Sequence, residues 1–131
     1  MSRIEIPCAV IETIEGSMLR ITYKNEYDIH LADVTELNDV LTDLVETGPI
    51  YTVVNANSKF FNLSKDAQEY LATTAPIVSR IKASAVLINN LPIRLIVRFF
   101  ISTYNPKFPT KIFKHEKEAI DWITSVKQEY E

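Results

Sequence analysis

Cys8, His30 and Asp33 are the side chains that could support nucleophilic chemistry in this chain of 131 residues. A thiol, an imidazole and a carboxylate are the residue types of a nucleophile, its base and the group that orients the base. The sequence spacing of these three residues does not indicate that they converge in space, and no known catalytic pattern surrounds them. We therefore expect a protein that is not an enzyme and has no catalytic residues.

His30, His115 and the one cysteine could form a metal site only if they converged with carboxylates. A row of acidic side chains at helical spacing comprises Glu36, Asp39, Asp43 and Glu46. Because ligands must reach a cation from several directions, this row indicates a solvated helix face, with recognition of a basic partner or divalent ions as the alternative. With only 2 glycines, a glycine-rich phosphate loop is also excluded. We expect neither a metal nor a cofactor.

The charge balance argues against nucleic acid as a partner. The formal net charge of −3 provides no broad basic surface for phosphates. The charge is nevertheless uneven, since residues 1–76 carry 5 basic and 12 acidic side chains, whereas residues 77–131 carry 9 and 5. This asymmetry could steer a partner or self-association, and two solvated faces of different sign are the simpler explanation.

The first twelve residues, MSRIEIPCAVIE, lack the apolar core of a secretory signal. The segment Ala83–Ile101 has the length of a membrane span, but polar, charged and helix-breaking residues interrupt it. These residues are Asn89, Asn90, Pro92, Arg94 and Arg98. A single cysteine also excludes an internal disulfide framework. We expect a cytoplasmic protein without stable membrane insertion.

The N-terminal third of the chain reads as strands followed by a helix. Alternating apolar residues predict strands at Ala9–Glu15 and Met18–Tyr23, and the short Gly16-Ser17 connection predicts an antiparallel hairpin. A third short strand is expected at residues 27–31. Asp33 is the expected N-cap of the first helix, which Gly48 and Pro49 terminate.

Strands and helices then alternate. Buried strands are expected at Ile50–Asn55 and Ala83–Ile88, and a short strand at Thr110–Lys114. Between them, we expect a polar loop at residues 56–63 that contains Phe60 and Phe61, a helix capped by Ser64, and an ambiguous segment at residues 77–82. Two further helices should span about 91–103 and 116–128. This order predicts one α/β domain over residues 1–131, with a mixed sheet of antiparallel N-terminal strands and later parallel strands, and about four helices.

The helix that begins near Leu91 carries more apolar surface than a helix packed on a sheet requires. Arg94 and Arg98 are four residues apart and therefore share a face, while Phe99 and Phe100 help to cover the rest. The second apolar face could pack on a neighbouring helix, form a homodimer or partner interface, or line a pocket for an apolar ligand or touch a membrane. We predict that Arg94, Arg98, Phe99 and Phe100 contact a partner.

Four segments and the hairpin at the start resemble the anti-sigma-factor antagonist superfamily, the SpoIIAA-like or STAS domains, including small bacterial STAS/SEC14-like proteins. These segments are IYTVVN, SKDAQEYLA, KASAVLINNLPIRLIVRFFI and FPTKIFKHEKEAIDWI. The resemblance implies a cytoplasmic α/β domain that regulates by binding partner proteins.

Antagonists of this superfamily carry a serine that is phosphorylated in an Asp-Ser-Ser/Thr-Gly type segment after a central strand. This chain has Ala56-Asn57-Ser58-Lys59 at that place instead. Ser58 lies nearest to the expected position, and a phosphate on Ser64 would meet a helix N-terminus. A loop serine and a structural cap are the simpler explanations, so we note Ser58 and Ser64 as possible phosphorylation sites without assigning the switch to this chain.

These observations lead to two hypotheses of function. The first is a non-enzymatic STAS-like regulatory or protein-interaction domain, with an unknown protein partner or a homodimer at the helix near residues 91–102. The second is a carrier of a small apolar or lipid-like ligand held between this helix and the sheet, which a fully packed helix–sheet interface would contradict.

Overall fold

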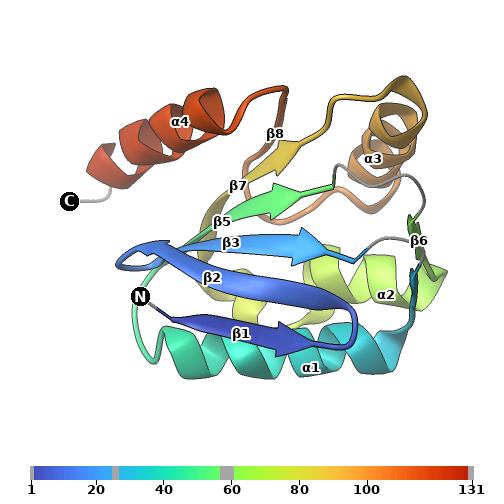
Figure 1. The fold of residues 1–131 in the computed structure, drawn as a ribbon, viewed down its shortest axis with the longest axis horizontal. Coiled ribbons are helices and arrows are strands. Elements are labelled where there is room, and N and C mark those ends of the chain that lie inside the picture. Colours follow the sequence, from blue (N-terminus) through green and yellow to red (C-terminus); the bar gives the residue numbers. More distant parts are fainter. Residues whose placement is uncertain (1, 25–26, 57–60, 130–131) are drawn as a thin grey trace.

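The computed structural model describes residues 2–24, 27–56 and 61–129, and a six-stranded sheet lies at its centre (Figure 1). The strand order is β1-β2-β3-β5-β7-β8. The strands span Arg3–Ile6 (β1), Ala9–Glu15 (β2), Met18–Tyr23 (β3), Ile50–Asn55 (β5), Ile81–Leu87 (β7) and Thr110–Phe113 (β8). Strands β1 to β3 are antiparallel, and the pairs from β3 to β8 are parallel, so the predicted mixed sheet is confirmed.

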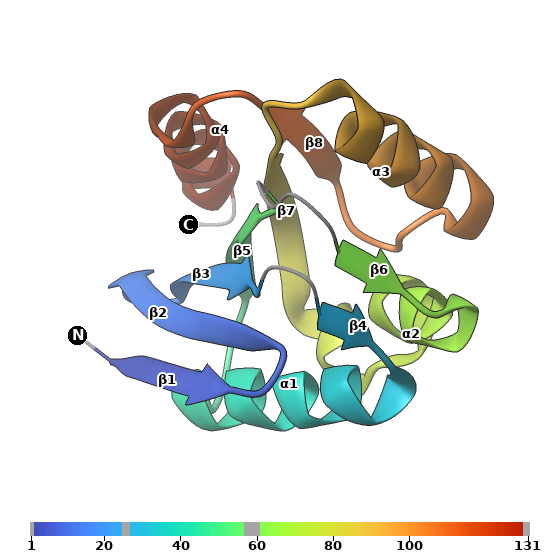
Figure 2. The same ribbon diagram turned by 45° about the vertical axis from the view of Figure 1, so that its right-hand side comes forward.

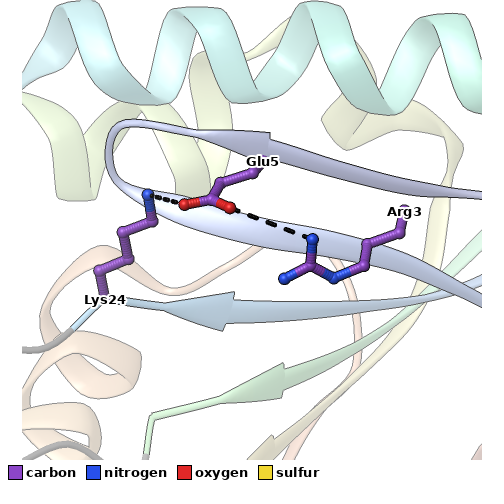
Figure 3. A network of polar contacts seen from close by, with 3 residues as sticks. All are labelled: Arg3, Glu5 and Lys24. Carbon is purple, nitrogen blue, oxygen red and sulfur yellow. Dashed lines mark hydrogen bonds and ion pairs between the residues drawn. The ribbon is translucent and has the colours of Figure 1, made fainter.

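The predicted hairpin forms at Gly16, whose φ of 55° lies in the left-handed region that glycine adopts without strain. Strand β1 was not expected, and it adds an edge strand to this hairpin. Lys24 Nζ lies 2.7 Å from Glu5 Oε2, and Arg3 Nη1 lies 4.0 Å from Glu5 Oε1 (Figure 3). The hydrogen bond from Lys24 lowers the pKa of Glu5 and joins β1 to the end of β3, whereas the Arg3–Glu5 pair lies within β1.

The third predicted strand forms but does not join the main sheet. Strand β4 (Tyr27–Ile29) pairs in parallel with β6 (Phe61–Leu63) to form a separate two-stranded sheet (Figure 2). The expectation of a loop throughout residues 56–63 is therefore wrong at its end, where β6 forms. Phe60 lies outside the described residues.

Helix α1 (Leu31–Leu44) begins earlier than predicted, because His30 rather than Asp33 is its N-cap. Asp33 lies in the first turn, and its Oδ2 accepts a hydrogen bond of 2.8 Å from the His30 backbone N–H. This bond is the carboxylate half of a capping box. The predicted inward residues Val34, Leu37 and Leu41 are buried.

Helices cover both faces of the main sheet (Figures 1 and 2). One face carries α1, α2 (Lys65–Glu69), the π-helical turn η1 (Tyr70–Thr74), the 3₁₀ turn η2 (Pro76–Arg80) and α3 (Leu91–Tyr104). The other face carries α4 (Glu116–Glu129). The predicted helices near 91–103 and 116–128 are confirmed, and the ambiguous segment at 77–82 consists of η2 and the start of β7.

Successive side chains of β5 point to opposite faces of the sheet and therefore contact different helices. Tyr51 and Val53 point to the α4 face, where they form a dense cluster with Ala119 and Ile123. Thr52 and Val54 point to the opposite face. Arg20 Nε also lies 2.5 Å from Glu116 Oε1 and ties β3 to the start of α4. The two faces of the sheet therefore have different surroundings, and the central strands are packed against α4 on one face only.

Candidate functional site

A cavity of about 170 Å³ lies between the sheet and the helices opposite α4. Its floor comes from the second face of the central strands and includes Thr52, Val54, Ser84 and Val86. Its walls come from α1, α2, η1, η2, the loop before β8 and α3. Most of these side chains are apolar, so the cavity is suited to an apolar molecule.

The cavity exists because the core on this face is divided. One cluster packs around α1 and η2 and includes Leu37 and Ile77. A second, smaller cluster lies beneath α3 and contains the buried residues Val86 and Ile93. Val54 packs against both clusters and lines the space between them. Helix α3 is therefore held to the sheet on one side while a gap separates it from the α1 cluster.

Local sequence signals fix both ends of α3. The Asn90 side chain accepts a hydrogen bond of 2.9 Å from the Ile93 N–H, and Pro92 fits the first turn. At the other end, Asn105 has a φ of 47°, the left-handed conformation that commonly ends a helix. These caps hold the helix over the cavity although only Ile93 among its residues is buried.

Helix α3 divides its apolar residues between the cavity and the solvent. Val97 and Phe100 are half-buried and line the cavity, and Ile96 lines it while 51% exposed. On the outward side, Leu91 is 64% and Phe99 is 66% exposed. The cavity wall at Ile96 is therefore continuous with the exposed surface of α3.

The four predicted partner-contact residues do not share one face. Phe99 and Arg98 are exposed, and Arg94 is half-buried. Phe100 turns toward the cavity, and its ring centroid lies 5.8 Å from that of Tyr104. The sequence pattern could not predict which of Phe99 and Phe100 is exposed, because the two residues are adjacent in one apolar run.

Polar groups also line the cavity. The Thr52 hydroxyl donates a hydrogen bond of 2.9 Å to Ser84 Oγ, and both residues are buried. Asn38 is buried on α1, and its Oδ1 accepts a hydrogen bond of 3.0 Å from the Ile77 N–H. Sequence reasoning missed these residues, and the only signal was their position as polar residues within otherwise apolar patterns.

Among the described residues, none that lines the cavity carries a charge. Tyr23 is the ionisable residue of this described lining, and burial raises the pKa of its hydroxyl, which therefore stays neutral at physiological pH. A cavity with these walls strongly disfavours an ionised ligand, because a buried charge without a partner is costly.

The side chains of Cys8 and Asp33, which were weighed with His30 as a nucleophile, a base and an orienting group, make structural contacts. Cys8 is buried, and its thiol points to the Asp33 backbone carbonyl at 4.0 Å. Burial, together with the charges of Asp33 and Glu36, raises the pKa of the Cys8 thiol to about 11. The Asp33 carboxylate is engaged at the start of α1. The thiol is therefore protonated at neutral pH, and the thiolate, which is the nucleophilic form, is disfavoured.

We expect deprotonation of the Cys8 thiol to affect stability at alkaline pH. Its pKa is raised in the folded protein, so the unfolded chain loses this proton first, and folding is penalised as the pH rises above about 9. Urea titrations at pH 8 and pH 10 should show a smaller loss of unfolding free energy for Cys8→Ala than for the wild type. An equal loss of unfolding free energy in Cys8→Ala and the wild type would contradict a buried thiol that is protonated in the folded protein.

The remaining candidate sites are occupied by structural contacts or lie on the surface. Of the acidic row, Glu36, Asp39 and Asp43 are exposed on α1, and Glu46 is exposed just beyond the end of this helix. Across the described ranges, no group of three or more His, Cys, Asp or Glu side chains could hold a metal ion. No described helix has both the length and the apolar character needed to cross a membrane.

Ser64 caps α2, as predicted. Its Oγ accepts a hydrogen bond of 3.3 Å from the Ala67 N–H and donates one of 2.5 Å to Asp66 Oδ1. This hydrogen bond from Ser64 lowers the pKa of Asp66. Ser58 lies outside the described residues. Phosphorylation at either serine stays a prediction.

Comparisons with known proteins agree with this architecture. Residues 12–127 match the model of a family described as "Domain of unknown function (DUF7793)". No curated protein matches the chain. A solved structure of an uncharacterized protein from the DUF3478 family, with a SpoIIAA-like fold, from Shewanella loihica PV-4 is similar. It shares 16% identity and a TM-score of 0.62, over 87% of this chain and 90% of that chain.

At 16% identity the likeness establishes the fold and nothing about activity. It confirms the prediction of a SpoIIAA-like mixed sheet that was made from the order and character of the segments. The family match covers most of the chain, from β2 to the last turns of α4. The protein therefore belongs to the DUF7793 family, and its fold is SpoIIAA-like.

Proposed function

We propose that this protein is a non-enzymatic binding domain that takes a small apolar ligand into the cavity beneath α3. The observation that carries this proposal is the division of the core into two clusters with a space of about 170 Å³ between them. An apolar cavity of about 150 Å³ is large enough to bind benzene. The ligand is therefore about the size of a substituted benzene or a short alkyl chain.

The geometry favours ligand binding over a purely structural void. Native cores pack densely and contain few voids larger than a water molecule, whereas this space separates two apolar clusters and opens to the surface. The cavity also reaches the exposed part of α3 at Ile96, which provides an entry side. Titration of the wild-type protein with ethylbenzene, followed through the methyl resonances of cavity residues, tests the proposal.

A second candidate function rests on the outward face of α3. Leu91, Leu95 and Phe99 are each more than half exposed and follow one another at four-residue spacing, so they form one apolar stripe. Arg98 and Arg94 flank the stripe, and α3 contains no acidic residue. We propose that this stripe docks a protein partner whose contact patch is apolar with an acidic rim.

Charge favours such a partner over a second copy of the chain. A symmetric contact between two α3 helices would bring Arg94 and Arg98 of one copy close to those of the other, and like charges in an interface oppose association. An acidic rim would instead pair with both arginines. Because α3 also forms a wall of the cavity, a bound ligand could shift the helix and so regulate docking.

We predict that Phe99→Glu prevents docking without affecting the cavity, since the side chain is 66% exposed and does not line the cavity. A photo-crosslinker at position 95 in the native cell should give an adduct with one acidic protein. Phe99→Glu should remove this adduct, whereas Glu36→Lys on α1 should keep it. Light scattering tests the alternative that the stripe forms a homodimer. A dimer mass for the wild type and a monomer mass for Phe99→Glu would assign the stripe to a homodimer and contradict our proposal.

A further inference from the structure

Two buried hydroxyls on the cavity floor have one donor more than their contacts use. Thr52 and Ser84 lie directly opposite each other on β5 and β7 and are 3% and 5% exposed. A single hydrogen bond of 2.9 Å joins their oxygens. Whichever hydroxyl donates this bond, the proton of the other remains, and it has no acceptor among the described residues. Buried hydroxyl groups are rarely left without a hydrogen-bond acceptor, so we expect a bound molecule to accept this proton.

A second unused donor lies on the α1 wall of the same cavity. Asn38 is 93% buried, and its Oδ1 accepts the Ile77 N–H. The two hydrogens on its Nδ2 have no acceptor within the described part of the chain. By contrast, the half-buried Gln68 and Thr110 already donate to backbone carbonyls. The fully buried polar groups of the cavity therefore require an acceptor.

The lining excludes charge on the molecule that supplies this acceptor. In the described part of the chain, no lysine, arginine, histidine, aspartate or glutamate lines the cavity, and Tyr23 stays neutral because burial raises its pKa. A carboxylate would have no cation to pair with, and the penalty for burying it exceeds the gain from hydrogen bonds to neutral donors.

We propose that the cavity selects an uncharged ligand with an apolar body and one acceptor oxygen, such as a ketone, ester or ether, and that the Thr52–Ser84 hydroxyl pair donates to this oxygen. This inference rests on the proposed function and adds the chemical class of the ligand. It distinguishes the true ligand from a plain hydrocarbon of equal size and from a fatty or aromatic acid.

Three probes of similar shape test this inference. Acetophenone carries a neutral acceptor, ethylbenzene has none, and benzoate is charged. The double variant Thr52→Val with Ser84→Ala removes both hydroxyls while preserving shape, a change that costs little stability because no partner is left unpaired. Asn38 is kept, since its replacement would leave the Ile77 N–H without an acceptor. Ser79→Ala, at an exposed serine of η2, is the control.

The affinity of the wild type and each variant for the three probes is measured by calorimetry at neutral pH. We expect the ratio of acetophenone to ethylbenzene affinity to fall about fivefold to tenfold in the double variant and to stay constant in Ser79→Ala. Benzoate should bind wild type about a hundredfold more weakly than acetophenone.

Each other outcome has a definite meaning. If both neutral probes bind and the ratio is the same in all variants, water satisfies the hydroxyl pair, and the inference is wrong while the proposed function stands. Benzoate that binds as well as acetophenone also overturns the inference. If neither neutral probe binds the wild type, the cavity is not a ligand site, and both proposals fail.

Discussion

Val54→Phe is expected to block ligand binding without lowering the free energy of unfolding, whereas Val53→Phe, one residue earlier, should lower it by about 1–3 kcal/mol. The two valines point to opposite faces of β5. Val53 is fully buried against α4, where a larger ring must displace its neighbours. Val54 borders the cavity, so a phenyl ring at that position enters existing space.

This pair of variants is matched in residue type, substitution and strand. Urea denaturation gives the two unfolding free energies, and ethylbenzene titration gives the affinities. We expect the affinity of Val54→Phe to fall more than about tenfold because the ring occupies the ligand's volume. Equal destabilisation of both variants would mean that no usable space lies beside Val54.

Ile123→Ala should produce the opposite combination, with lower stability and intact binding. Ile123 is fully buried in the cluster that fixes α4 to the sheet, and truncation of such a side chain costs about 2–5 kcal/mol. Ile96→Ala is the matched control, because Ile96 is half exposed on α3, and we expect a loss of less than about 1 kcal/mol.

Ethylbenzene affinity should be unchanged in Ile123→Ala at a temperature where the variant is folded, since α4 lies on the face of the sheet opposite the cavity. Loss of affinity in the folded variant would contradict this division of roles. A destabilisation equal to that of Ile96→Ala would show that α4 is not held by this contact.

Local patterns predicted most of the fold. Alternation identified the β2–β3 hairpin, and short apolar runs identified β5 and β7. The ends of α3 and α4 were predicted within one residue. At α3 the signals are local, because Asn90 and Asn105 act through neighbouring backbone groups. Such signals depend on a few adjacent residues, and the sequence contains all of them.

The features that were missed depend on distant residues. Strand β1 has four residues and forms as an edge on β2. Strand β6 has three residues, and its pairing with the predicted β4 joins segments more than 30 residues apart in the sequence. Strands this short carry almost no periodic signal. The start of α1 was misplaced because Asp33 satisfies both an N-cap pattern and a capping-box pattern.

The site was predictable only in outline. Helix α3 has more apolar side chains than packing on the sheet requires, and this excess indicated a pocket or an interface. In the structure, Phe100 lines the cavity and Phe99 is exposed to solvent. The Thr52–Ser84 pair joins residues 32 positions apart, and no local pattern indicates that they meet. The parallel register of β5 and β7 brings them together.

The central claim is that an apolar ligand enters the space between α3 and the sheet. The most direct measurement is a titration of methyl-labelled wild-type protein with ethylbenzene, followed by NMR. We predict saturable shifts at Leu41, Val54 and Val97, which line the cavity, and none at Val53 or Ile123 on the opposite face. Absent shifts, or shifts confined to Leu91 and Leu95 on the outer side of α3, would contradict the account.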